Sequence, residues 1–553
     1  MNKNRSLPAL GLMLTLSLLA SSAPVAPAAA DEPLTVAESS LYTSTSLHKD
    51  VLSFIGALQK RSRLLRVESM GRSAEGRDIP LIILADPPVS SPADLKKGGR
   101  AVVYIQANIH AGEVEGKEAS LMLARDILLQ KKPAVLDKLV VLIAPIFNPD
   151  GNDKVDRKNR PQQDGPENGV GVRHNGLNQD LNRDAMKLES PELQAVVKNV
   201  LLRWDPALAM DLHTTNGFYH EEPVTFAWAP VPNADPAIRA FLRDKLQVAV
   251  EERMREVHNV RAIMYGEPRS FQDFGKGFES YGTVPHFFTN YVSLRNRLAI
   301  LNENYNHADF KTRVLGCRAL LESVLTFARD NKDTILTLVA EADRKAVERG
   351  ARPSDQETFG LTFEAKPIER QLTIEVWETE IVPRPGGGYP EMKKTDRKKT
   401  MVLPFFAEYQ PTRSVRFPAG YFITVPDEAV IGKLRQHGLA VERLTAPASA
   451  EVESFVLKEL KTGARPFQGH WMNTVKGEYA KLKKEFPAGT YFVATGQPLG
   501  ALAASLLEAE SIGGLLAWNY FDKYISPQWS REWGEYPVFR LLEPVVLAKE
   551  AVR

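Results

Sequence analysis

Between residues 31 and 349, short apolar runs of strand length alternate with longer stretches of helical periodicity. The expected strands are 79–85, 101–107, 139–146, 207–212 and 298–301, and the expected helices are 47–61, 117–129, 191–203, 235–257 and 310–329. Strands that alternate with helices favour parallel pairing, because a helical crossover returns the chain to the same end of the sheet. We therefore expect an α/β fold with a largely parallel sheet in this part of the chain.

Residues 350–553 have a different character and begin with the linker-like segment Ala351-Arg-Pro-Ser-Asp. The pattern predicts strands at 372–379, 400–406, 415–425 and 490–494, a helix at 498–507 and an αβ-like stretch at 427–444, with a Pro-Gly-Gly-Gly-Tyr turn between the first two strands. Five of the seven Trp lie here, and we expect most of them in a core rather than on a sugar-binding platform, because aromatic residues dominate core burial. This mixed α/β or β-rich region is interpreted as accessory, with no role assigned.

The first thirty residues have the three parts of a secretory signal peptide. Lys3 and Arg5 precede the apolar run 9–20, and small residues lead to Ala28-Ala29-Ala30. The apolar run is shorter than a bilayer requires, so a membrane-spanning helix is the weaker interpretation. We expect a secreted or periplasmic protein with a signal at 1–30, a first domain at 31–349 and no integral membrane span after signal removal.

Charge and cysteine content exclude several classes of function. The formal net charge is +2, and residues 1–30 carry two basic and no acidic residues, so the exported chain is near 2 − 2 = 0. A neutral surface does not favour nucleic acid or anionic lipid as a partner. Cys317 is the single cysteine, so no internal disulfide forms, and its apolar neighbours disfavour a role as nucleophile.

Residues with metal-ligand chemistry follow two of the expected strands. His110 and Glu113 come directly after 101–107, and His213 ends 207–212. Open α/β folds place their sites where strands end, and two imidazoles with one carboxylate are a common catalytic zinc set. Although an H-x-x-E motif alone arises by chance, the three residues together predict a zinc site. Asp211 or the Thr hydroxyls after His213 are expected to hold the second ring nitrogen of His213.

Three polar clusters lie between these ligands: Asn148-Pro-Asp-Gly151, Arg157-Lys-Asn-Arg160 and Asp180-Leu-Asn-Arg-Asp184. Isolated clusters of this kind are usually solvated loop charges. Arginines beside a metal also suit the binding of a carboxylate and of a developing oxyanion. The order of the clusters therefore points to a hydrolase that recognises a carboxylate.

In this order the motifs resemble those of the zinc metallocarboxypeptidases, over about residues 40–330. The resemblance implies a three-layer α/β/α domain with a mixed, largely parallel sheet. It also implies one Zn²⁺ per chain, held by His110, Glu113 and His213. By the same resemblance, Arg157 stabilises the oxyanion, and Asn182 and Arg183 grip the free C-terminal carboxylate of a peptide substrate.

The family also uses a general base on a late strand, and Glu303 ends the apolar run from Leu298. Glu303 is therefore expected to deprotonate the attacking water and to protonate the leaving amine. Glu115 and Glu118 are the alternatives, on the helix after the ligand loop.

A mobile tyrosine upstream of the base is a further property of the family. Tyr281 lies 303 − 281 = 22 residues before Glu303, which is the family-like separation, and Tyr291 remains the alternative. Arg295 and Arg297, close to Tyr291, are additional candidate substrate contacts.

The resemblance implies an exported zinc metallocarboxypeptidase that hydrolyses C-terminal peptide bonds. Two departures leave the substrate open: Glu113 and His213 are 213 − 113 = 100 residues apart, fewer than in the digestive enzymes, and no residue identifies the pocket for the terminal side chain. The alternatives are a cell-wall peptide (murein) amidase or endopeptidase, a zinc N-deacylase of the same fold, and a non-catalytic binding protein.

Overall fold

A computed structural model describes residues 32–97, 99–129, 133–215, 217–382, 391–527, 529 and 532–552. The expected signal peptide and the Gly-rich turn at 385–389 lie outside the described residues. Residues Leu34–Arg553 form one compact unit. Within the described ranges, no helix has both the length and the apolar character needed to cross a membrane.

The centre of the molecule is an eight-stranded mixed sheet. Its strands are β1 (Leu65–Arg72), β2 (Asp78–Leu84), β3 (Ala101–Ala107), β4 (Leu139–Ala144), β5 (Leu208–Thr214), β6 (Val224–Trp228), β7 (Ala262–Met264) and β10 (Leu298–Asn304). The order is β1-β2-β4-β3-β5-β10-β6-β7, and β4, β3, β5 and β10 run parallel at the centre. Antiparallel pairs join β1 to β2, β2 to β4 and β6 to β10. The expected mixed α/β sheet is confirmed.

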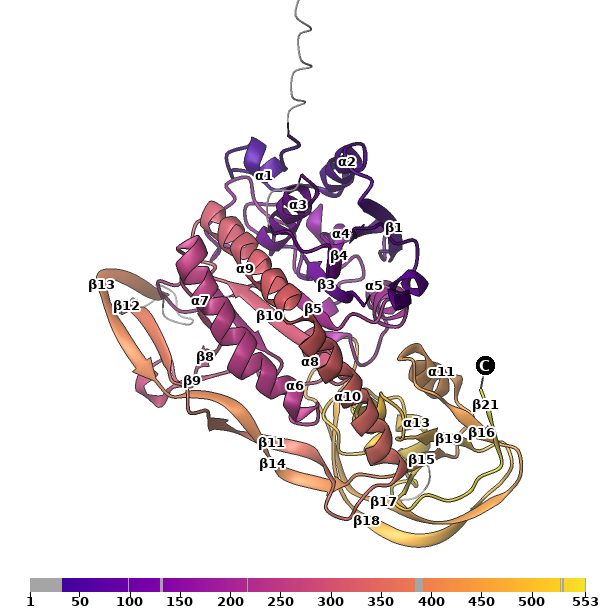
Figure 1. The fold of residues 1–553 in the computed structure, drawn as a ribbon. Helices are drawn as coiled ribbons and strands as arrows, with labels where there is room; N and C mark the ends of the chain where they lie inside the picture. The colour runs from indigo at the N-terminus through magenta and orange to yellow at the C-terminus, as the bar shows by residue number, and fades with distance from the viewer. Residues whose placement is uncertain are drawn as a thin grey trace, which may run out of the picture. The chain divides into compact units, whose positions relative to one another are not determined.

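Helices cover both faces of this sheet, which gives three layers. One face carries α2 (His48–Gln59), α3 (Glu115–Leu128), α7 (Gln247–His258) and α9 (Phe310–Asp330), and the other carries α5 (Pro191–Val196) and α8 (Phe288–Ser293). Figure 1 shows α7 and α9 side by side across β10 and β5. A first core lies between the sheet and the face that carries α3 and α9, and a second core lies on the opposite face, which carries α5 and α8. Val103 and Ile105 point into the first core, whereas Val102 and Tyr104 point into the second, as the alternation along a strand requires. Strands buried on both faces account for the continuous apolar runs of the sequence.

Helix α10 (Lys332–Ala351) leads into a β-rich region. A seven-stranded sheet has the order β18-β17-β20-β15-β19-β16-β21, with β15 (Gly420–Ile423), β16 (Glu442–Leu444), β17 (Ala448–Thr462), β18 (Asn473–Phe486), β19 (Tyr491–Ala494), β20 (Val538–Leu541) and β21 (Lys549–Ala551). Helices α11 (Glu428–Gln436), α12 (Gly500–Leu507) and α13 (Asp522–Ile525) accompany it, and β12 (Leu372–Val382) pairs with β13 (Glu391–Leu403).

The β-rich region packs directly on the central sheet. A four-stranded sheet combines β8 (Glu267–Pro268) and β9 (Phe278–Glu279) with β11 (Thr358–Pro367) and β14 (Phe405–Arg416). The second core also continues from Tyr291 of α8 into the later chain, where the Tyr291 hydroxyl lies 2.8 Å from His437 Nδ1. Segments on the two sides of residue 350 therefore share a sheet and a core.

The tryptophans of the β-rich region are mostly not core residues. Trp518 is completely buried, but Trp471 is 50% exposed and Trp529 is 99% exposed. The expectation of a largely buried set was wrong, because loops and hairpin ends carry these side chains and the apolar core is filled by Phe, Leu and Val instead.

Candidate metal centre and substrate pocket

The candidate site lies at the carboxyl ends of three adjacent parallel strands. In the pairing register, Ala107 of β3 lies beside Leu212 of β5, and His213 of β5 lies beside Glu303 of β10. Neighbouring parallel strands end at the same edge of a sheet, so residues at or just after these ends meet there.

A tight turn after β3 brings both members of the H-x-x-E pair to this edge. Asn108 has a φ of 67°, in the left-handed region that Asn tolerates, and its side-chain amide donates to the carbonyls of Ala111 and Glu113. A Cβ at Gly112 would lie 2.8 Å from the Gly171 carbonyl oxygen, so only glycine fits. The chain therefore leaves the strand geometry that would have pointed His110 and Glu113 in opposite directions.

The three predicted ligands converge on one point. Nδ1 of His110 lies 3.0 Å from Oε1 of Glu113, Nδ1 of His213 lies 2.9 Å from Oε2 of Glu113, and the two Nδ1 atoms are 3.1 Å apart. A tetrahedral zinc ion with bonds of about 2.0–2.1 Å separates its ligand atoms by about 3.3 Å. Among the described residues, this is the group that could hold a metal ion.

The far side of each imidazole decides which nitrogen faces the cluster. His110 Nε2 lies 3.1 Å from Oδ1 of Asp180, and His213 Nε2 lies 2.9 Å from Oδ2 of Asp211. With each Nε2 donating to its aspartate, both Nδ1 atoms present lone pairs toward the Glu113 carboxylate. Three acceptors at such short range repel one another unless a cation lies among them, so the donor set fits a zinc ion.

Glu113 is held as a carboxylate. Arg160 Nη2 donates to its Oε1 at 2.6 Å, and the backbone N–H of Thr214 donates to its Oε2 at 3.1 Å. Burial opposes ionisation here, but the neighbouring His110 and Arg160 side chains outweigh it and keep the pKa of Glu113 well below its usual value.

A pocket of about 170 Å³ opens beside the cluster. Its lining comprises His110, Glu113, Arg173, Asn182, Arg183, Thr214, Thr215, Tyr265, Glu267, Tyr281, Phe287, Thr289, Leu301 and Glu303. The structure thus brings Asn182, Arg183, Tyr281 and Glu303 into one pocket beside the candidate metal ligands.

Glu303 lines the pocket together with two other carboxylates, Glu113 and Glu267. Burial raises its pKa to about 8, with Glu113 and Glu267 adding to the rise and His213 opposing it. The alternative bases lie elsewhere: Glu115 contacts Thr214 and Arg313, and Glu118 accepts hydrogen bonds from Thr45 and Ser46. Of these glutamates, only Glu303 lines the pocket.

Asn182 and Arg183 lie in the short helical turn η2 (Leu181–Arg183), which the Asp180 side chain caps by accepting from the Asn182 N–H. Asn182 Oδ1 accepts a hydrogen bond of 2.8 Å from the Phe288 N–H. The Arg183 guanidinium lies 4.6 Å from the centroid of the Phe287 ring. The turn is therefore fixed to the 287–288 segment while its charged group faces the pocket.

Arg157 is not part of this site. It is exposed and donates to Asn168 Oδ1 at 3.0 Å, outside the pocket. Two other arginines are present instead: Arg160 binds Glu113, and Arg173 lines the pocket and donates from Nε to Asp180 Oδ2 at 2.8 Å. The order of the motifs does not distinguish among the three arginines. The position of Arg173, seven residues before Asp180 (180 − 173 = 7), is the one feature of the sequence that places it close to the Asn182–Arg183 segment.

The remaining candidates separate by location. Tyr281 lines the pocket, and its hydroxyl lies 3.0 Å from Thr289 Oγ1. Tyr291 and Arg295 instead contact His437, and Arg297 pairs with Asp205 and Asp343. Burial between the central sheet and the β-rich region accounts for Tyr291 and Arg295, and the two ion pairs account for Arg297.

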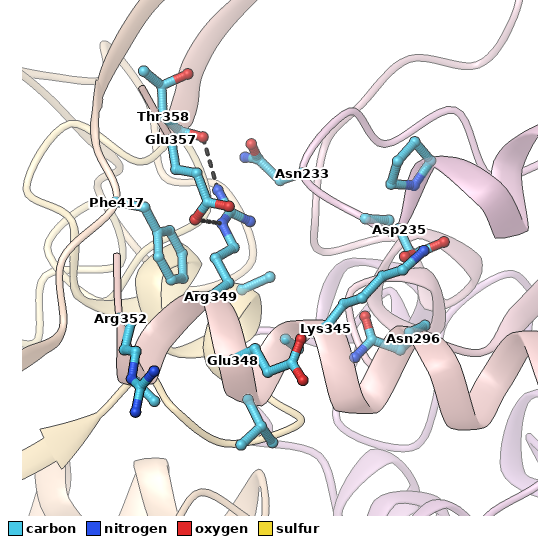
Figure 2. Close-up of a pocket in the computed structure, with 17 residues that line it drawn as sticks. Asn233, Asp235, Asn296, Lys345, Glu348, Arg349, Arg352, Glu357, Thr358 and Phe417 are labelled. Carbon is cyan, nitrogen blue, oxygen red and sulfur yellow. Dashed lines mark hydrogen bonds and ion pairs between the residues drawn. The ribbon is translucent and has the colours of Figure 1, made fainter. Parts of the chain in front are cut away.

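A larger cavity, of about 1010 Å³, lies between α10, the start of α6 (Pro236–Phe241) and β11. Figure 2 shows Arg349 reaching Glu357 and the Thr358 carbonyl there, next to Phe417. The metal-ligand cluster found among the described residues is not in this cavity. Chemistry rather than size identifies the candidate active site.

Comparison with known proteins agrees with this geometry. Residues 51–217, which contain all three candidate ligands, match the zinc carboxypeptidase family. The match covers this segment and not the rest of the chain. Together with the carboxypeptidase relatives it supports a metallopeptidase, and the zinc-carboxypeptidase resemblance of the motifs is confirmed.

Similarity to individual proteins extends beyond the matched segment. Carboxypeptidase 2 of Trichophyton rubrum is 24% identical over 493 residues, which cover 85% of this chain and 81% of that protein. Carboxypeptidase D of Homo sapiens is 29% identical over 172 residues, 30% of this chain and 12% of that protein. A metallo-carboxypeptidase structure from Burkholderia cenocepacia aligns with a TM-score of 0.38 at 18% identity, covering 52% of this chain and 70% of that one.

Proposed function

We propose that this chain is an exported, zinc-dependent carboxypeptidase that removes residues from the free carboxyl end of peptides. One observation carries the proposal: the ligand group His110, Glu113 and His213 opens into the same pocket that Asn182 and Arg183 line. Export is supported by the signal-like residues 1–30.

Recognition of the terminal carboxylate falls to Arg183 and Asn182. A guanidinium matches a carboxylate with two parallel hydrogen bonds, and the contact of Arg183 with Phe287 limits the positions that its head can take. A peptide without a free carboxylate would leave this half-buried charge without a counter-ion, which disfavours internal cleavage.

Chemistry at the scissile bond is divided among the other pocket residues. A bound zinc ion would polarise the carbonyl and acidify water. Glu303, with its raised pKa, can take the proton from that water and return it to the leaving amine. Arg173 is the guanidinium in the pocket beside Glu113, and we assign it the oxyanion role in place of Arg157. To Tyr281, which lines the pocket, we assign a hydrogen bond from its hydroxyl to the substrate.

Glu267 points to the preferred terminal side chain. It is the pocket carboxylate outside the metal cluster and the base position, it accepts a hydrogen bond of 3.3 Å from the Tyr265 hydroxyl, and burial raises its pKa. A substrate Lys or Arg would supply the counter-charge that favours ionisation of Glu267. We infer a preference for basic C-terminal residues.

The test is cleavage of matched peptides followed by mass spectrometry. Each sequence is prepared with a free carboxylate and as its amide, and each ends in Lys, Phe or Asp. We expect stepwise loss of terminal residues from the free-acid forms, fastest for Lys. Equal cleavage of amides would refute the exopeptidase assignment, whereas equal rates for the three termini would refute only the preference.

A further inference from the structure

The β-rich region reaches the candidate active site through the tip of its longest hairpin. Strands β17 and β18 pair along their length and are joined by residues 463–472. Gln468, within that tip, accepts a hydrogen bond of 2.8 Å at Oε1 from the backbone N–H of Asp180. Asp180 begins the turn that carries Asn182 and Arg183.

The backbone at the tip is unusual for the residue that it carries. Phe467 and His470 exchange two backbone hydrogen bonds, of 2.8 and 3.0 Å, around Gln468 and Gly469. Both central residues have a positive φ, 50° for Gln468 and 81° for Gly469, as in a type I′ turn. Asn, Asp or Gly are favoured at the first of these positions, so Gln468 keeps a conformation that its own backbone disfavours. Such strain persists where surrounding contacts determine it.

Asp180 links this contact to the catalytic groups. Its carboxylate caps the Asn182 N–H, receives Arg173 Nε and lies 3.1 Å from His110 Nε2. These contacts fix the side chain of Asp180, whereas the bond from Gln468 fixes its peptide group. The position of the peptide group determines where the chain enters the η2 turn.

Further contacts hold the hairpin tip beside the segments that surround the Asn182–Arg183 turn. His470 Nε2 lies 2.8 Å from Glu189 Oε1, and the Phe467 ring stacks on Trp518 with centroids 6.1 Å apart. Phe467 is also 6.1 Å from His286, whose ring adjoins the Phe287 ring beneath Arg183. The carboxylate-binding turn is therefore enclosed by the 285–288 segment and by the hairpin tip.

We propose that the β17–β18 tip contributes to the substrate site. In this proposal Gln468 is a positioning residue for Asn182 and Arg183, which bind the substrate carboxylate. The proposal rests on the carboxypeptidase function proposed above. It assigns to the β-rich region a role in recognising the peptide terminus, through the peptide group of Asp180.

Two substitutions separate positioning from simple stabilisation of the turn. Gln468→Gly removes the acceptor but relieves the positive φ, so the melting temperature should be unchanged or higher. Gln468→Met removes the acceptor and keeps the side-chain length. For both we expect KM for a free-carboxylate peptide to rise about fivefold, the ratio that one hydrogen bond supplies, with kcat and zinc content unchanged. Arg465→Ala, exposed in the same tip, is the matched control.

A KM that stays at the wild-type value in both variants would overturn the proposal. So would a rise that Arg465→Ala shares, because the effect would then belong to the loop as a whole. Cleavage of amidated and free-acid peptides by the wild-type enzyme distinguishes failure of this proposal from failure of the proposed carboxypeptidase function. If it cleaves amidated peptides as well as free acids, the carboxypeptidase assignment fails before the variants are compared.

Discussion

Asp211 provides a sharp test of how the metal centre is built. Its Oδ2 receives His213 Nε2 at 2.9 Å and its Oδ1 receives Gln106 Nε2 at 3.2 Å, and both Asp211 and His213 are buried. In Asp211→Ala, the His213 ring loses its anionic partner. Its proton is then free to move to Nδ1, the atom that faces Glu113 and His110.

The expected change in zinc affinity follows from the loss of the hydrogen bond between His213 and Asp211. A hydrogen bond to a charged group contributes about 1.5–3 kcal/mol, and about 1.4 kcal/mol corresponds to a tenfold change in an equilibrium constant. The zinc Kd should therefore rise about 10- to 100-fold, which is the range for loss of such outer partners. Asp211→Asn retains an acceptor oxygen without the charge, so its Kd should lie between those of the wild type and Asp211→Ala.

Zinc affinity is measured by competition with a chromophoric chelator, together with the melting temperature of the metal-free protein. Asp137→Ala, an exposed change of the same chemical type, serves as the control. A zinc Kd in Asp211→Ala equal to that of the wild type would refute coordination through Nδ1 of His213.

Three further predictions concern the catalytic groups. Glu303→Gln should lower kcat by about 10²- to 10⁴-fold while zinc stays bound, and turnover near the wild-type rate would remove Glu303 from the base role. Arg173→Ala should lower kcat by about 10²- to 10³-fold while Arg157→Ala leaves it unchanged, and the reverse result would restore the assignment from motif order. Activity should fall as pH falls, because the base must be ionised. Burial raises the pKa of Glu303 to about 8 without metal, and a bound cation lowers it, so the midpoint of kcat should lie between about 4.3, the ordinary value of Glu, and 8. A kcat that is flat to below pH 4 would contradict this.

The convergence of the candidate metal ligands was predictable because each one lies at or shortly after the end of an apolar strand. Strand ends in a parallel sheet share an edge, so His110, His213 and Glu303 could be expected together before any contact was known. The large sequence separation between His110, His213 and Glu303 did not prevent this prediction. The largely parallel α/β sheet followed from the same periodicity, whereas the mixed strand directions and the helices on both faces were implied by the family resemblance.

Loop residues were less predictable. Arg157, Arg160 and Arg173 are chemically equivalent, and only the path of the loop decides that Arg157 faces solvent. Tyr281 and Tyr291 likewise differ by the surfaces that pack around them.

The contribution of Gln468 depends on a contact between residues 288 positions apart. No local pattern in the chain encodes such a contact. The tryptophan expectation was wrong for a related reason, because composition does not distinguish a core position from a hairpin tip.

Zinc titration of the metal-free enzyme tests the central claim most directly. Chelator-treated protein is given increasing zinc, and release of the terminal residue from a free-carboxylate peptide is measured at each step. We predict that activity rises in proportion to zinc and reaches its plateau at one equivalent per chain, and that His213→Ala gains no activity over the same range. Activity that is independent of zinc, or that is recovered equally by His213→Ala, would contradict a catalytic zinc centre at His110, Glu113 and His213.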